Sequence, residues 1–198
     1  MSRKPTMDSR RWTLLALSGI FLLVLVIIFF RSGGRELIRP TEDILPGEAA
    51  MGAEAGREAK EVMLYFPSES DGLLHPELRR IPGGSSVAEE ARQAVEELIK
   101  GSSEGYLSPL PPGTRLRQLF VTKDGIAYVD FSREIVEEHP SGSSAELSTV
   151  YSVVNTLAYN FRPIKKVFIL VEGGERETLG GHINLSQAFV PLDSLNVR

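Results

Sequence analysis

Residues 115–131 read RLRQLFVTKDGIAYVDF, and this stretch decides the fold that the sequence predicts. Two runs of strand-forming residues flank Asp124-Gly125, a pair that favours a tight turn because glycine adopts positive φ without strain. In the second run, apolar residues occupy every other position from Ala127 to Phe131, as a strand with one buried face requires. The stretch therefore predicts an antiparallel hairpin formed by 115–122 and 126–131.

A helix and another strand are predicted after this hairpin. Ser143-Ser144-Ala145-Glu146 has the spacing of a capping box. The apolar residues that follow recur on one helical side until Arg162-Pro163 ends the pattern. Residues 167–171 (VFILV) are typical of a buried strand, which would lie next to the hairpin through a right-handed crossover if the two strands are parallel. Residues 175–179 are expected to form an optional further strand that turns back and pairs with 167–171.

The sequence before the hairpin predicts one strand and one helix. Residues 62–66 (VMLYF) form a short apolar run ended by a proline, and 68–84 is a polar loop with room for a second short strand. A helix is expected from a capping box at Ser86 to Lys100, where Gly101 stops it. The order βαββαβ, with an optional last strand, predicts an α+β fold in which two helices cover one face of a small mixed sheet.

The N-terminal part of the chain predicts a membrane anchor. Residues 13–30 (TLLALSGIFLLVLVIIFF) carry no charge, and as a helix they would span roughly 27 Å, close to the hydrocarbon thickness of a bilayer. The basic residues in 1–12 are expected to hold the N-terminus in the cytoplasm. A cleaved signal peptide is the alternative, but the run is long for one and ends at Phe30-Arg31 without a small-x-small site.

This anchor sets the predicted organisation of the chain. Residues 1–12 are a cytoplasmic basic N-terminus, 13–30 a transmembrane signal anchor, 31–60 a flexible linker rich in glycine, and 61–198 an extracytoplasmic domain. The protein is therefore expected to be a single-pass protein of the cytoplasmic membrane, with its folded domain outside.

Composition excludes several classes of function. The 198 residues contain no cysteine, which rules out disulfides, a thiolate nucleophile, a cysteine-ligated zinc and an acylated cysteine as lipid anchor. The predicted domain holds 13 lysines and arginines against 19 aspartates and glutamates, a formal charge of −6. This acidic balance argues against nucleic acid or anionic lipid as its main partner.

Four segments together resemble the GerMN domain of bacterial sporulation and spore-germination proteins. They are 62–66, AYVDFS at 127–132, VYSVVNTL at 150–157, and 167–171 with TLGGH at 178–182. The resemblance implies a tethered extracytoplasmic module of the cell envelope, with a fold similar to the ring-building modules of secretion-like complexes. It implies envelope proteins as partners, self-association as an open alternative, no cofactor and no established catalytic activity.

Catalytic or metal-binding residues are not predicted. The three histidines, His75, His139 and His182, fall in predicted loops without the HExxH spacing of a metalloprotease. Neither a nucleophile beside a base nor a phosphate-binding glycine loop is evident. We therefore expect a protein that is not an enzyme, with a hydrolase as the weakest of the alternatives.

Two small groups of residues are candidate contacts. Glu69, Asp71 and His182 are candidates for a small ligand such as a cell-wall fragment. The competing interpretation is a solvated loop for the two acids and a tight turn for the Gly-Gly-His segment. Tyr106 and Leu107, in a proline-rich loop, are candidates for protein contact. Asp130 is expected to be an ordinary charge on the solvent face of its strand.

Overall fold

The computed structural model describes residues 58–197. The predicted N-terminus, the anchor at 13–30 and nearly all of the predicted linker lie outside these described residues, and those predictions stand untested. Within 58–197, no helix is both long and apolar enough to cross a bilayer.

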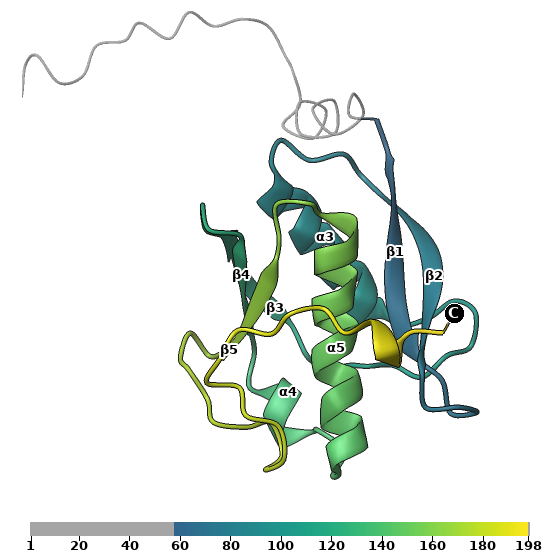
Figure 1. The fold of residues 1–198 in the computed structure, drawn as a ribbon, viewed down its shortest axis with the longest axis vertical. Helices are drawn as coiled ribbons and strands as arrows, with labels where there is room; N and C mark the ends of the chain where they lie inside the picture. The colour runs from purple at the N-terminus through teal and green to yellow at the C-terminus, as the bar shows by residue number, and fades with distance from the viewer. Residues whose placement is uncertain (1–57, 198) are drawn as a thin grey trace, which may run out of the picture. The chain divides into compact units, whose positions relative to one another are not determined.

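The strands form two separate sheets (Figure 1). Strands β1 (Lys60–Pro67) and β2 (Leu74–Ile81) make an antiparallel hairpin. Strands β3 (Leu116–Val121), β4 (Ile126–Phe131) and β5 (Lys166–Val171) make the second sheet in that spatial order. In it β3 and β4 are antiparallel, as the Asp124-Gly125 turn predicts, whereas β4 and β5 are parallel. The α+β class is confirmed, and so is the mixed character of the larger sheet.

Three predictions about the strands are wrong. The first strand does not join the sheet of β4 and β5 but pairs with β2 alone, so one mixed sheet becomes two. Strand β2 is the second short strand for which the predicted polar loop had room, but the predicted order βαββαβ is wrong because the observed order starts with two strands. Residues 175–179 form no strand. Within residues 58–197, the edge of β5 carries only isolated bridges, from Val171 to Gly174 and from Val167 to Phe189.

The helices begin where the sequence predicts, although only one of the two predicted serine N-caps forms. Helix α3 (Val87–Lys100) has Ser86 as N-cap, whose hydroxyl accepts a hydrogen bond from the Glu89 backbone N–H at 3.2 Å. Helix α5 (Ser143–Asn160) starts after Gly142 without a side-chain cap. The predicted capping box at its start is wrong, because Glu146 points to another part of the chain. A short helix α4 (Glu134–Glu137) follows β4.

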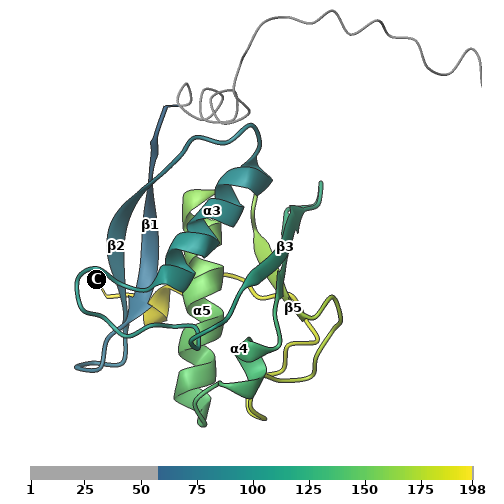
Figure 2. The same ribbon diagram turned by 180° about the vertical axis from the view of Figure 1, so that it is seen from behind.

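Helix α5 lies between the two sheets, as Figures 1 and 2 show from opposite sides. Six consecutive residues of this helix, Ser152 to Leu157, are buried, which a helix enclosed on several sides requires. Both predicted helices do pack against the larger sheet, α3 on β3 and α5 on β5. The helix nevertheless contacts β1 as well, so a second sheet covers the side that the prediction left to solvent.

Helix α5 also completes the edge of the smaller sheet. The side chain of Asn160 accepts from the backbone N–H of Met63 at 2.8 Å and donates to the Met63 carbonyl at 2.6 Å. The Thr156 hydroxyl accepts from the backbone N–H of Tyr65 at 3.1 Å. Backbone groups on a strand edge need partners when water is excluded. Side chains of α5 therefore do for β1 what a third strand would otherwise do.

Candidate functional site

An apolar groove opens beside the first turns of α5. Its volume is about 390 Å³. The walls come from segments far apart in the sequence: the end of β1 at Pro67, the loop at Leu107 and Pro109, the residue Pro140, and Leu195 near the C-terminus. Ala145, Leu147, Ser148 and Thr149 of α5 line one side. All of the lining residues are uncharged, so the groove suits an uncharged apolar group with a few hydrogen-bonding atoms.

The wall that carries Leu107 is held by a buried carboxylate on β2. Glu77 is 1% exposed and accepts hydrogen bonds from the hydroxyls of Ser102 at 2.6 Å and Ser103 at 2.7 Å. Arg79 adds an ion pair to the same carboxylate at 2.5 Å. The loop is then fastened to β1 by the bond from the Leu107 N–H to the Pro67 carbonyl, 2.9 Å. Leu107 itself stays 47% exposed at the groove.

These hydrogen bonds keep Glu77 ionised. Burial by itself would raise the pKa of the carboxyl, but the bonds from Ser102, Ser103 and Arg79 favour the charged form. Together they outweigh the burial and lower the pKa to about 2. The loop that forms one wall of the groove therefore depends on a carboxylate that stays charged at every ordinary pH.

The turn after β1 places the first two ligand candidates near the groove. Asp71 pairs with His75 at 2.9 Å, and the His75 ring packs on the ring of Tyr106 with centroids 4.9 Å apart. The backbone N–H of Leu73, followed by the His75 ring, holds the pKa of Asp71 below its usual value. Glu69 is exposed in the same turn. Tyr106 thus supports the loop from behind, while its neighbour at 107 lines the groove.

A hydroxyl on α5 supports the other side of the loop. The Thr149 side chain is 2% exposed and donates to the Pro109 carbonyl at 2.6 Å. The hydroxyl oxygen of Thr149 also lies 2.9 Å from Nε2 of His139. This contact ties the proline-rich loop to the helix that forms the opposite side of the groove. Sequence reasoning missed Thr149, because a threonine inside a helix gives no sign that its partner lies 40 residues away.

His182, the third ligand candidate, belongs to a different cluster. Glu146 is fully buried in the first turn of α5 and accepts from the backbone N–H groups of His182 at 3.1 Å and Ile183 at 2.9 Å. Its carboxylate also lies 2.7 Å from Nδ1 of the His182 ring. Within 58–197, no hydrogen bond or ion pair joins His182 to Glu69 or Asp71. The structure therefore brings the two acids near each other and His182 to a separate place.

The comparison with family models shows to which protein family the chain belongs. A model described as "Germane: Sporulation and spore germination" matches residues 63–177, more than half of the chain. This chain belongs to the Germane, or GerMN-domain, family. The match contains most of β1, all of β2 to β5 and most of the groove, whereas the 180–183 segment and Leu195 lie beyond it.

Solved structures support the same fold. The tandem GerMN domains of the sporulation protein GerM from Bacillus subtilis align with a TM-score of 0.56 and 26% identity, over 67% of this chain and 46% of that one. The first GerMN domain of the same protein aligns with a TM-score of 0.51 and 24% identity, over 67% of this chain and 97% of that one. This chain thus spans about half of the tandem structure. No curated protein sequence matches it.

One further prediction about this GerMN domain is wrong. Asp130 is 5% exposed rather than a charge on a solvated face. Its carboxylate pairs with Arg117 at 2.8 Å and accepts from the Gly173 backbone N–H at 2.8 Å. The turn after β5 folds over it, and only the tertiary structure brings that turn there. Among residues 58–197 of the GerMN domain, no three histidines or carboxylates are arranged to hold a metal ion.

Proposed function

We propose that this GerMN domain is an extracytoplasmic protein-interaction module of the bacterial cell envelope, which acts by binding and not by catalysis. In this proposal residues 13–30 tether it to the cytoplasmic membrane. The observation that carries the proposal is the groove beside α5, with uncharged walls and Leu107 47% exposed at it. An exposed apolar side chain beside an apolar hollow is typical of a site for another protein.

The chemistry of the walls defines the partner. An acidic or basic peptide would leave its charges without counter-ions among the lining residues, which costs free energy when water is excluded. An uncharged segment with leucine-like or proline-like side chains would bury apolar surface instead. Ser144 and Ser148 of α5 line the groove and would offer their hydroxyls to its backbone groups, whereas the Ser108 hydroxyl already donates to the Leu110 carbonyl at 2.9 Å. We therefore expect an uncharged apolar segment of an envelope protein as the partner.

The place of the groove suits a tethered domain. The N-terminal part of the chain joins the domain at Lys60, the first residue of β1, and the groove begins at Pro67, the last. The eight residues of β1 rise about 3.3 Å each, so the two points lie more than 20 Å apart along the strand. The groove therefore lies at the other end of β1 from Lys60, so an N-terminal tether would not join the domain at the groove itself.

A second candidate function is a sensor of a small uncharged ligand. The groove's volume of about 390 Å³ lies within the common range for small-molecule sites, roughly 300–1,000 Å³. Serine hydroxyls in its walls would suit sugar hydroxyls, including those of a cell-wall fragment. Glu69 and Asp71, in the neighbouring turn, keep their predicted role as ligand contacts under this alternative.

A site-specific crosslink distinguishes the two candidates. We would place a photoreactive phenylalanine analogue at Leu107 in the full chain in its native membranes, and the same analogue at Leu78 as the control. Leu78 is 54% exposed on β2 and does not line the groove. We expect one discrete protein adduct from position 107, absent at 78 and absent after Leu147→Asp. Adducts of equal yield at both positions, or none at 107, would contradict the docking role.

The small-ligand alternative has its own measurement. Muropeptides and neutral wall sugars would be added to the full chain during thermal unfolding, because a ligand that binds the folded state raises Tm. A rise in Tm that Leu147→Asp abolishes would favour the sensor. The absence of any rise, together with a crosslink at position 107, would leave the protein-interaction module.

A further inference from the structure

We propose that the outer edge of β3 pairs with β3 of a second copy of this chain, about a two-fold axis at Phe120, to make one continuous sheet across both copies. This self-association uses a surface separate from the groove. It rests on the unpaired backbone of β3, on an aromatic stack that ends at Phe120, and on the uncharged sequence of the strand.

The backbone of β3 is open on one side from Leu119 to Val121, whereas nearer the start of the strand Arg92 of α3 donates to the Arg117 carbonyl at 3.4 Å. In the antiparallel pair with β4, the Thr122 N–H donates to the Ile126 carbonyl, so alternate residues, including Phe120 opposite Tyr128, also direct their backbone groups towards β4. Leu119 and Val121 therefore direct theirs outwards. Within the part of the chain that the structure describes, neither amide donates to any acceptor. Figure 2 shows β3 from the side that faces away from the viewer in Figure 1.

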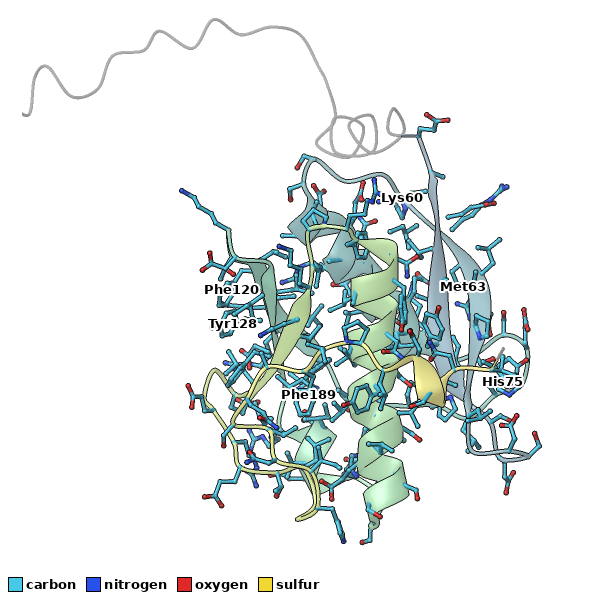
Figure 3. The ribbon with its side chains drawn as sticks, viewed as in Figure 1. Lys60, Met63, His75, Phe120, Tyr128 and Phe189 are labelled. Atoms are coloured by element: carbon cyan, nitrogen blue, oxygen red, sulfur yellow. The ribbon has the colours of Figure 1, made fainter. Side chains whose placement is uncertain are left out.

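An aromatic stack crosses the outer face of the same sheet and ends at this edge. The rings of Phe120 and Tyr128 are 4.8 Å apart and nearly parallel, at 8°, and those of Tyr128 and Phe168 are 5.4 Å apart. Figure 3 shows Phe120 and Tyr128 side by side on the side of the sheet away from α5. Phe120 is 47% exposed, and among the strands of residues 58–197 none pairs with the outer edge of β3. The stack thus stops with one ring face uncovered.

The stacked geometry limits the surface that a sugar or a nucleobase could use, because the neighbouring rings cover each other. A flat ligand of that kind needs free aromatic faces. Here Tyr128 lies between Phe120 and Phe168, so its ring is covered on both sides. At the strand edge the stack ends in a ring face of Phe120, a residue that is 47% exposed. A further aromatic ring on an added strand would continue the stack.

A second copy supplies such a strand with matching register. With Phe120 opposite its counterpart, Leu119 of each copy faces Val121 of the other, and both pairs can exchange backbone hydrogen bonds. Phe120 then occupies a site without backbone bonds, where opposite Cα atoms lie only about 4.5 Å apart and side chains contact closely. The two rings would join the two aromatic stacks into one.

The charges around the edge permit this pairing. Residues 118–122 (QLFVT) are uncharged and contain neither the lysine nor the proline that commonly protects an exposed edge strand. In this register Arg117 of each copy lies opposite Lys123 of the other, a like-charge pair at each end of the contact. Arg117 already pairs with Asp130 at 2.8 Å, which offsets its charge, and the central residues that meet are uncharged.

The contact area predicts a weak dimer. A single six-residue edge with a few aromatic side chains buries less than the roughly 800 Å² per partner of a standard stable interface. We expect a Kd of about 10–100 µM in solution, consistent with so small an interface. Confinement to a membrane would raise the effective concentration and favour the pair.

Cysteine crosslinking tests the register, because the native chain has no cysteine. Phe120→Cys in the full chain would place two sulfurs opposite each other at the axis. Gln118→Cys is the matched control, on the same strand and face. Its counterpart would lie four residues out of register, about 14 Å away along the strand and beyond disulfide reach. We expect an oxidised homodimer from the first variant and at least tenfold less from the second. Equal yields would overturn the proposal.

Sedimentation with two further variants tests the pairing without a crosslink. Phe120→Lys puts like charges at the axis, and Leu78→Lys puts the same charge on a comparably exposed site of β2. Val121→Pro removes an outward amide that β4 does not use. We expect Phe120→Lys and Val121→Pro to weaken self-association at least tenfold and Leu78→Lys to leave it unchanged. A monomeric wild-type chain at 1 mM, or a disulfide to another protein in place of the homodimer, would overturn the proposal.

Discussion

The carboxylate of Glu146 lies fully buried within 2.7 Å of the His182 ring, 36 residues further along the chain. The same carboxylate accepts the backbone N–H groups of His182 and Ile183, so the first turn of α5 holds a C-terminal segment in place. Gly180 approaches it so closely that a Cβ there would lie 3.0 Å from Oε1 of Glu146. The tight-turn interpretation of the Gly-Gly-His segment thus has a structural cause, and the ligand role of His182 stays a prediction.

Replacing this carboxylate should destabilise the domain. We expect Glu146→Gln to lower the free energy of unfolding by about 1–3 kcal/mol, because the neutral amide satisfies the backbone donors less well and brings its own buried N–H groups. Glu137→Gln, an exposed change on α4, is the control. Urea unfolding measures the difference, and hydrogen exchange should show faster exchange at 182 and 183. Equal stability of both variants would contradict the anchoring role.

The low pKa of Glu77 predicts a loss of stability in acid. Its folded-state pKa of about 2 lies below the ordinary 4.5, so its contribution is fully present above pH 4.5 and is lost as the pH falls towards 2. At about 1.36 kcal/mol per pH unit, the contribution is up to about 3 kcal/mol. Denaturant unfolding between pH 2 and pH 6 measures it. The Glu77→Gln variant should show a shallower pH dependence, and a parallel curve would contradict the assignment.

The two hydrogen bonds between the Asn160 side chain of α5 and the Met63 backbone of β1 are expected to stabilise the folded domain. Asn160→Ala leaves the N–H and the carbonyl of Met63 without their partner, and we expect a loss of about 1–3 kcal/mol. Arg162→Ala, two residues on and exposed, should cost less than about 0.5 kcal/mol. Thermal and urea unfolding compare the two. A similar small effect from both would show that water replaces the asparagine at this edge.

A substitution at the exposed wall of the groove should weaken partner binding without lowering the free energy of unfolding. Leu107→Asp changes a side chain that is 47% exposed, so the free energy of unfolding should shift by less than about 0.5 kcal/mol, while partner binding falls at least tenfold. Thr149→Val removes the bond to Pro109, and we expect it to cost about 1 kcal/mol. Crosslinking from the groove and urea unfolding measure these effects. Undiminished binding by Leu107→Asp would contradict the proposed site.

The structure also explains why the predicted strand count failed at β2. Its sequence, LHPELRRI, contains a proline and four charged or ionisable groups beside its apolar ends. Glu77 is buried only because Ser102 and Ser103, 25 and 26 residues away, surround its carboxylate. A pattern search assigns such a residue to solvent, since the partners that make its burial tolerable cannot be read locally. The prediction that Asp130 faces solvent was wrong for the same reason, because the Gly173 N–H that its buried carboxylate accepts comes from a distant turn.

By itself the sequence determined the elements whose causes are local. Period-two alternation and a glycine turn specified the hairpin of β3 and β4, and Gly125 indeed has φ +83°. The Ser86 cap and apolar periodicity specified α3, and four short segments were enough to identify the GerMN family, which the 63–177 match confirms. Such signals act between residues a few positions apart, where the intrinsic preferences of the chain are strongest.

Only the tertiary structure decided the division into two sheets, the enclosure of α5 and the shape of the groove. The groove joins Pro67, Leu107, Pro140 and Leu195, and no pattern within one segment specifies that these four meet. The carboxylates of Glu77 and Glu146 hold two of the loops by bonds across 25 to 37 residues. Long-range contacts of this kind form only when the chain has folded, because each buried charge requires donors that arrive from elsewhere in the fold.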